Sequence, residues 1–300
     1  MDRLKAMKVL TAAIEAGSLS AAGRRLNMPL ATVSRIVSEL EAHLKARLLH
    51  RTTRRLTLTD AGQAYVAAAR RILEDVDEAE RAAGGAYAVP RGELVVTAPI
   101  VFGRLHMLPV VTDFLRGHAE IDVRLLLSDR NLDLVDQHVD AALRIGTLPD
   151  SGMVATRLGM VRRVTCASPD YLKRRGMPKA PADLARHDGI GFVALDAAGA
   201  WQFPSGAVTV RERLAVTTAE AGIDAAVAGM GVARLLSYQV ADALKAKTLR
   251  VILAAHEPAP LPVHMLHTAQ KLMPRKLRAF LDFAVPRLKA RLTQMDRIVP

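Results

Sequence analysis

Two short helical patterns on either side of a break at residues 27–29 constrain this chain more than any other feature. Ser18 or Ser20 can cap the first helix, because a serine hydroxyl accepts a hydrogen bond from an N–H group at a helix start. The Asn-Met-Pro break ends that helix, and a second one is predicted over about 30–44. The sequence therefore predicts a helix, a turn and a second helix.

The second helix has one apolar and one polar face. Its apolar residues recur at steps of three and four, which places them on one side of a helix: Val33, Ile36, Val37, Leu40 and Leu44. The opposite face carries small polar groups and two charges: Thr32, Ser34, Arg35, Ser38 and Glu39. A helix that is held by its apolar side and presents hydrogen-bonding groups outward suits the major groove of DNA.

Basic residues follow this helix with no acid between them: Lys45, Arg47, Arg51, Arg54 and Arg55. The threonine-rich run over 51–58 favours extended structure, so we expect a two-stranded wing. Cations on such a ribbon neutralise backbone phosphates, which adds affinity without sequence choice. The candidate DNA contacts of the whole motif are Ser18, Ser20, Thr32, Ser34, Arg35, Arg51, Thr53 and Arg54.

The charge distribution agrees with a nucleic-acid partner. Of a formal net charge of +12, residues 1–58 carry +7, from eleven Lys or Arg against four Asp or Glu. A basic unit of this kind attracts DNA by counterion release, although an anionic membrane surface would attract it too. The sequence has no apolar run long enough to span a membrane and no secretory signal pattern, so the cytoplasm is the expected location.

The length of the chain and its cysteine content limit the possible folds and sites of the remaining residues. A chain of 300 residues, 50% of them hydrophobic, is enough for two or three domains with a substantial core. Cys166 is the only cysteine, so the chain can form neither an intrachain disulfide nor a thiolate metal cluster. Its apolar, strand-like neighbours favour a buried structural thiol. We expect no metal and no other cofactor.

Two further helices complete the N-terminal unit. An apolar stripe between Leu4 and Ile14 predicts a helix that ends at Gly17, and residues 59–62 open a long helical pattern that should end at 84–85. The long helix has a narrow, alanine-rich apolar side, so a helix from a second copy is its natural cover; the alternative is packing on its own winged domain. Because one recognition helix touches few base pairs, we expect a homodimer or homotetramer.

Beyond Pro90, short β-rich runs alternate with helical patterns. The expected strands are 93–98, 122–127, 141–145, 162–167, 189–193, 214–217, 232–235 and 263–267. The expected helices are 102–115, 132–138, 169–175, 219–229 and 275–285. The alternation predicts an α/β fold with an open, mostly parallel sheet covered by helices. Ligands of such sheets bind at the carboxyl ends of the strands, which here are the turns Thr97-Ala98-Pro99-Ile100, Ser128-Asp129 and Ile145-Gly146-Thr147.

The N-terminal residues resemble the signature of the LysR-type transcriptional regulators. The matching residues are Ala16-Gly17-Ser18, Ala21-Ala22, Leu26, Val33-Ser34-Arg35, Leu40-Glu41, Leu44, Arg51 and Leu58-Thr59-Asp60-Ala61-Gly62. Weaker family-like positions follow at Gly92-Glu93-Leu94, Leu108-Pro109, Phe114, 140–146 and 228–233. The resemblance is specific over residues 1–65 and, with the later positions, spans the chain.

The resemblance implies a division into domains. It implies a winged helix-turn-helix domain over 1–58, a linker or dimerisation helix over 59–87, and a periplasmic-binding-protein-like effector domain over 91–300. The effector domain would have two α/β lobes, 91–162 with 268–300 and 163–267, joined by two crossing strands around a cleft. The cleft wall would be formed by Ala98, Pro99, Ile100, Ser128 and Ile145 in the first lobe and by Trp201 and Phe203 in the second.

The function that the resemblance implies is transcription regulation. An oligomer would bind interrupted palindromes in double-stranded promoter DNA, and a small-molecule effector between the lobes would change the spacing of the recognition helices. RNA polymerase becomes a further partner if the protein activates its promoters. The effector, the regulated genes and the direction of regulation stay open at this point.

Five residues depart from the family pattern. Lys45 stands where the family usually has glycine and Leu49 where it usually has phenylalanine, both at the entrance to the wing. Leu30-Ala31 replaces a common Gln-Pro at the start of the recognition helix, so base preference cannot be copied from relatives. Ala98 replaces a frequent Ser or Thr, which removes a hydroxyl that would bind a carboxylate.

The alternative from another class is an enzyme that acts on a metabolite and carries an appended DNA-binding module. Residues 229–231 follow a helix and lack a third glycine, so they form a turn and not a dinucleotide loop. The chain holds neither a Gly-x-Ser-x-Gly nucleophile elbow nor a zinc-protease motif. Arg104, His106 and Arg144 could meet an anionic effector; ion pairing or surface solvation is their alternative role. Without a convergent nucleophile, base and oxyanion donor, the sequence favours a sensor.

Overall fold

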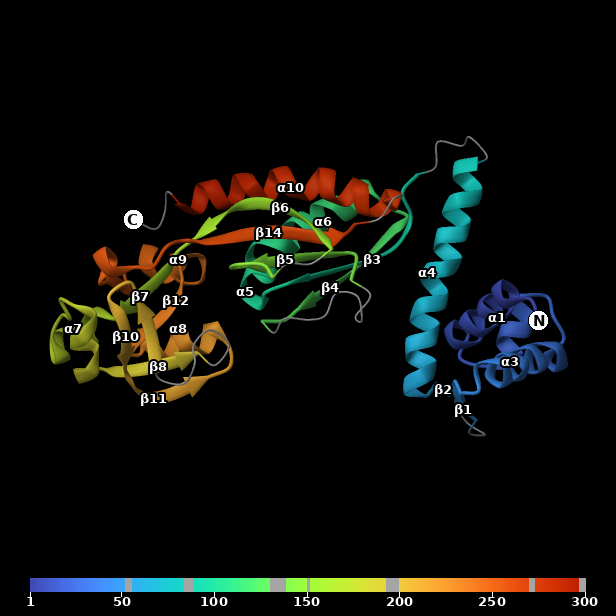
Figure 1. The fold of residues 1–300 in the computed structure, drawn as a ribbon, viewed down its shortest axis with the longest axis horizontal. Helices are drawn as coiled ribbons and strands as arrows, with labels where there is room; N and C mark the ends of the chain where they lie inside the picture. Colours follow the sequence, from blue (N-terminus) through green and yellow to red (C-terminus); the bar gives the residue numbers. More distant parts are fainter. Residues whose placement is uncertain are drawn as a thin grey trace. The chain divides into compact units, whose positions relative to one another are not determined.

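The structure is a computed structural model that describes residues 1–51, 56–83, 89–129, 139–149, 152–192, 200–269 and 273–296. The chain divides into two compact units, Met1–Val89 and Pro90–Pro300, which are described in turn (Figure 1). The helix predicted over 132–138 lies outside the described residues, as do the candidate wing contacts Thr53 and Arg54.

The N-terminal unit consists of three short helices, a hairpin and a long helix. Helices α1 (Arg3–Glu15), α2 (Leu19–Arg25) and α3 (Leu30–Leu44) are followed by the antiparallel strands β1 (Leu49–Arg51) and β2 (Leu56–Leu58) and by α4 (Asp60–Ala83). One hydrophobic cluster joins them, and its buried members include Val9, Leu10, Val33, Val37, Leu40, Leu48 and Val66. The predicted apolar stripe of α3 is its buried face, which leaves the polar face outward.

The first sheet of the C-terminal unit has the strand order β4-β3-β5-β14-β6. Strands β3 (Gly92–Ala98), β4 (Ile121–Leu127) and β5 (Ala141–Ile145) run parallel, whereas β14 (Leu261–Thr268) is antiparallel to both β5 and β6 (Met153–Val161). Between β3 and β4 the chain forms α5 (Ile100–Phe102), a π-helical turn η1 (Gly103–Met107) and α6 (Leu108–Gly117). These helices and α10 (Arg275–Asp296) pack on one face of the sheet through Phe102, Phe114, Phe280 and Leu288.

The second sheet has the order β11-β8-β12-β7-β13. Strands β11 (Arg211–Val216), β8 (Asp188–Phe192) and β12 (Val232–Leu236) run parallel, and β7 (Arg163–Ala167) is antiparallel to β12 and to β13 (Arg250–Ile252). Helices α8 (Ala219–Val227) and α9 (Ser237–Lys245) pack against this sheet. A separate cluster joins the sheet to α7 (Pro169–Arg175), to the 3-10 helix η2 (Pro181–Arg186) and to the hairpin of β9 (Ala200–Phe203) and β10 (Gly206–Thr209). A short 3-10 turn η3 (Ala254–His256) precedes β14.

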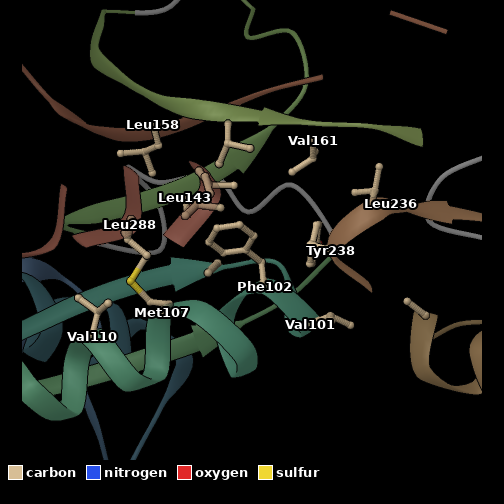
Figure 2. Packing of buried hydrophobic residues seen from close by; sticks show 14 of the residues in the cluster. Val101, Phe102, Met107, Val110, Leu143, Leu158, Val161, Leu236, Tyr238 and Leu288 are labelled. Atoms are coloured by element: carbon tan, nitrogen blue, oxygen red, sulfur yellow. The ribbon is translucent and has the colours of Figure 1, made fainter. Parts of the chain in front are cut away.

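The chain crosses between the sheets twice, from β6 into β7 and from β13 into β14. Because β14 belongs to the first sheet, the return comes before Leu261, whereas the sequence-based division kept 163–267 in the second lobe. One hydrophobic cluster runs through both lobes, and Figure 2 shows Phe102 beside Tyr238 and Leu236 near Val161. The two lobes therefore share one continuous hydrophobic core.

The predicted fold class is confirmed, with one correction to the sheets. Each lobe holds a mixed sheet and not a mostly parallel one, because β14 in the first lobe and β7 in the second run against their neighbours. Strands β6, β9, β10 and β13 were missing from the prediction. All predicted strands exist, with ends that shift by up to three residues.

Candidate nucleic-acid interface and ligand-binding turns

The turn between α2 and α3 follows from local side-chain chemistry. Ser18 is the N-cap of α2, where its Oγ accepts the Ala21 N–H at 3.2 Å. Ser20 lies half-buried in the first turn of the same helix. Asn27 takes a left-handed conformation with φ of 54°, which asparagine tolerates better than most residues and which turns the chain toward α3.

The outward face of α3 presents the side chains predicted to read DNA. Thr32 and Ser34 are half-buried, whereas the Arg35 side chain is 65% exposed. Arg35 forms an ion pair within the helix: its Nη1 lies 2.6 Å from Oε1 of Glu39, whose side chain is 42% exposed. The guanidinium therefore stands in solvent on the polar face, with one edge occupied by a carboxylate.

The wing is tied to both flanking helices. Oε1 of Glu41, in α3, accepts the N–H groups of Leu48 at 2.8 Å and Leu49 at 3.1 Å. At the start of α4, the Thr59 hydroxyl donates to Arg47 O at 2.7 Å and its N–H donates to Leu48 O at 3.0 Å. These bonds fix the first strand of the ribbon beside α3. Arg51 closes that strand opposite Leu56.

Lys45 explains one departure from the family pattern. It is the C-cap of α3 and has left-handed torsion angles, φ 51° and ψ 32°. Glycine adopts this conformation without a Cβ clash, which is why a glycine suits the position. The lysine adopts the same angles at a modest energetic cost, and the chain enters the wing as a regular hairpin.

The structure brings together the first two predicted ligand turns. The Ser128 N–H donates to Ala98 O at 3.0 Å, and the Ile100 N–H donates to Asp129 Oδ1 at 3.1 Å. Ala98 is fully buried, whereas Pro99, Ile100 and Ser128 are half-buried. These residues therefore form one surface at the carboxyl ends of β3 and β4.

Of the other predicted wall residues, Ile145 lies at the same edge of the first sheet, whereas Trp201 and Phe203 do not. Ile145 ends β5, where it pairs with Val263 of β14 and packs partly buried against the core. Trp201 and Phe203 lie in the hydrophobic cluster of the second lobe, Trp201 with no exposed surface. Their strand β9 pairs with β10 outside both five-stranded sheets, and both aromatic side chains pack inside the second lobe's own cluster, away from the turns of the first lobe.

Sequence reasoning missed Glu220, an acid of the second lobe that lies near Asp129 of the second predicted turn where the lobes meet. Oδ2 of Asp129 and Oε2 of Glu220, at the start of α8, are buried and have no hydrogen-bond partner among the described residues. Burial raises the pKa of Asp129, and the nearby Glu220 charge acts in the same direction. Arg104 Nε lies 3.7 Å from Glu220 Oε1, so Arg104 takes the ion-pairing role considered for it. Nothing in the local sequence of Glu220 signals this meeting, since it depends on the packing of the two lobes.

Two other titratable candidates, Cys166 and His106, are buried. Cys166 is buried in β7, and burial raises the pKa of its thiol to about 12. His106 packs against Phe102 and Tyr238, with ring centroids 4.9 and 5.9 Å away, and burial lowers its pKa to about 4. Within the described ranges, no cluster of three His, Cys, Asp or Glu could hold a metal ion, and no helix has the length and apolarity to cross a membrane.

A helix-turn-helix with a wing, joined to two mixed α/β lobes, defines a DNA-binding regulator with a ligand-binding domain. The profile of the bacterial regulatory helix-turn-helix protein, lysR family, matches residues 4–63, and that of the LysR substrate binding domain matches residues 88–289. The chain belongs to the LysR family of transcription regulators, which are not enzymes.

Similar proteins and structures match this chain over nearly all of its length. An HTH-type transcriptional regulator of Xanthomonas campestris pv. campestris is 36% identical over 284 residues, 92% of this chain and 82% of the relative. The structure of CrgA, a LysR-type transcriptional regulator from Neisseria meningitidis, is similar with a TM-score of 0.61 and 30% identity, and the match covers 95% of this chain and 98% of CrgA. The full-length structure of the Vibrio cholerae virulence activator AphB is similar with a TM-score of 0.59 and 25% identity, over 94% of this chain and 98% of AphB.

Proposed function

We propose that this regulator binds interrupted palindromes in promoter DNA as an oligomer and that a small-molecule effector bound in its C-terminal unit changes that binding. In this proposal residues 1–58 bind DNA, 59–87 form the dimerisation helix and 91–300 bind the effector. The protein then acts in the cytoplasm, where bacterial promoters lie, and contacts RNA polymerase at promoters that it activates.

The observation that carries the DNA-binding proposal is the outward face of α3. Its apolar side is buried, while Thr32, Ser34 and Arg35 stand on the open side, with Arg35 well exposed. Arginine can donate two hydrogen bonds to O6 and N7 of guanine, and hydroxyls contact bases or phosphates. Arg51 and Arg54 of the wing would contact flanking phosphates or the minor groove.

Replacement of Arg35 by alanine tests this assignment. We expect Arg35→Ala to weaken binding to a duplex selected by the wild-type protein from a random pool by about 1–3 kcal/mol, the value of one bidentate base contact. Arg54→Ala should instead weaken binding to all duplexes alike and flatten the salt dependence. A gel-shift series at several salt concentrations measures both effects, and the opposite pattern in the two variants would reject the assignment.

The oligomer is proposed because the DNA contact of one copy is small. A single recognition helix reaches only a few base pairs, and two copies related by a two-fold axis would read half-sites about one helical turn, or a multiple of it, apart. Helix α4 supports the proposal, because it is long and keeps an exposed apolar residue, Ile72. Sedimentation of the protein with the selected duplex gives the number of copies.

The effector proposal rests on the turns after β3 and β4. Pro99, Ile100 and Ser128 form a half-buried surface at the carboxyl ends of parallel strands, where ligands of such sheets bind. Ala98 lies beneath it, and Ile145 is placed at the end of the next strand. A ligand that binds one arrangement of the lobes better than another would shift the protein toward that arrangement.

A metabolite that binds these turns should stabilise the C-terminal unit. At a hundred times its dissociation constant, a ligand specific to the folded state adds about 2.7 kcal/mol to the free energy of unfolding. The measurement is a thermal-shift screen of the full chain against a metabolite library. Hits should lose their effect in a Ser128→Trp variant, which fills this surface. A hit that stabilises both proteins equally binds elsewhere and contradicts the placement.

A further inference from the structure

Glu39 places a negative charge on the face of α3 that should meet DNA. Residues 32, 35 and 39 follow one side of the helix, because they are separated by three and four positions. The Glu39 carboxylate is 42% exposed and lies 2.6 Å from Arg35. An acid at this place repels phosphates, so its presence in a unit that otherwise attracts DNA needs a reason.

The other acids of residues 1–51 each serve the fold. Asp2 accepts the Lys5 N–H at the start of α1, at 3.1 Å. Glu15, in α1, lies 2.7 Å from Arg25 of α2, and Glu41 holds the entrance of the wing. Glu39 differs, because its ion pair stays within one helix and joins no two elements.

Helix stability does not account for the Arg35–Glu39 pair. Exposed ion pairs stabilise proteins little, and salt screens them further. The order of the two residues is also the less favourable one for a pair within a helix, because the cation lies toward the N-terminus of α3 and the acid toward its C-terminus.

We propose that Glu39 is a positioning residue that makes Arg35 selective, an inference that rests on the proposed reading of DNA by α3. The carboxylate occupies Nη1 of Arg35 and neutralises its charge, so a single phosphate oxygen offers the guanidinium little gain. The remaining N–H donors of the fork stay free to meet two acceptors in the same plane. Guanine presents such a pair, O6 and N7, on a base edge in the major groove, whereas a phosphate contact rests mainly on charge, which the Glu39 carboxylate has already neutralised.

The Glu39→Gln variant tests the proposal. On a mixed-sequence duplex of 40 base pairs, we expect binding roughly three- to tenfold tighter, because Arg35 becomes free to contact a phosphate. The slope of log K against log salt should steepen by about 0.9, the value of one phosphate contact. Affinity for the duplex selected by the wild-type protein should stay the same or fall, so the ratio of the two affinities drops. Circular dichroism checks that the variant is folded.

Two controls separate positioning from simple repulsion. Glu80→Gln makes the same change in net charge about 30 Å along α4 from its start, and we expect no change in the affinity ratio. Because the carboxylate also repels phosphates directly, Glu39→Gln in an Arg35→Ala background should tighten binding to the mixed-sequence duplex, but clearly less than it does when Arg35 is present. An equal gain with and without Arg35 would show that Glu39 acts by repulsion alone and would overturn the proposal.

Three other results also overturn it. If Glu39→Gln weakens only the selected duplex and leaves the mixed-sequence duplex unchanged, Glu39 itself reads a base, as an acid can at cytosine N4. If Arg35→Ala weakens the selected duplex while Glu39→Gln changes neither affinity, only the role of Glu39 fails. If Arg35→Ala has no effect on the selected duplex, the proposed function fails with it.

Discussion

Replacement of Phe102 by alanine should lower the free energy of unfolding of the C-terminal unit by about 3–5 kcal/mol, the cost of removing a fully buried aromatic ring. Phe102 lies in α5 and has no exposed surface. Its ring centroid is 5.2 Å from that of Tyr238 in an edge-on arrangement, and the two rings belong to different lobes (Figure 2). The substitution therefore leaves a cavity where the core passes from one lobe into the other.

The single tryptophan makes this effect measurable in the full chain. Trp201 is fully buried in the second lobe, so its fluorescence in a urea titration follows the C-terminal unit and not the N-terminal helices. Phe283→Ala is the matched control, because Phe283 is half-buried in α10 beneath the Arg287 guanidinium. We expect the control to lose clearly less stability. An unchanged Trp201 transition in the Phe102 variant would mean that the lobes unfold independently, against the continuous core.

The helix-turn-helix could be predicted closely because its signals are local. The second helix was expected over about 30–44 and α3 spans Leu30–Leu44, since a proline before its first residue and an apolar stripe mark it within one segment. The serine cap of α2 was also predicted, and Ser18 fills that role. Such features depend on neighbours three or four residues away, which sequence alone shows.

Elements that depend on distant packing were harder to predict. The last helix is predicted over about 275–285, and the next residue, Pro286, lacks a backbone donor. The helix α10 continues to Asp296, and Leu288 and Leu292 are buried beyond the proline. Gly159 of β6 has no side chain, and Leu292 packs against it there: its Cβ lies 3.0 Å from the place where a Cβ at Gly159 would be. Burial on a strand more than a hundred residues earlier thus outweighs the local signal.

The candidate sites show the same contrast between local signals and distant packing. The proximity of Ala98 and Ser128 follows from a general rule, since parallel neighbouring strands end at one edge. The burial of Trp201 depends on a hairpin that the sequence did not indicate, and the meeting of Asp129 with Glu220 depends on the packing of two lobes. The local sequence identifies candidate residues, but the tertiary fold determines which of them lie close to each other.

Alanine in place of Gly62 should damage the N-terminal unit and its DNA binding together. A Cβ at Gly62, in the first turn of α4, would stand 2.0 Å from Leu48 O and 2.9 Å from the carbonyl carbon of Leu48. No real contact is that short, so the backbone of Leu48 would have to move. We expect a loss of about 1–3 kcal/mol in the stability of this unit, the usual cost of overpacking, or somewhat more because the obstacle is backbone.

Leu48 cannot move without releasing the wing. Its N–H is held by Glu41 of α3 and its carbonyl accepts the Thr59 N–H before α4. A shift that clears the new methyl group therefore breaks one of these bonds and displaces β1 from the recognition helix, so affinity for both selected and mixed-sequence duplexes should fall. Thermal unfolding by circular dichroism and a gel shift measure the two effects. Gly117→Ala is the matched control: its Cβ would meet nothing within 4 Å, so we expect unchanged or slightly higher stability and unchanged DNA binding. If Gly62→Ala is as harmless as the control, Leu48 does not tie the wing to α4.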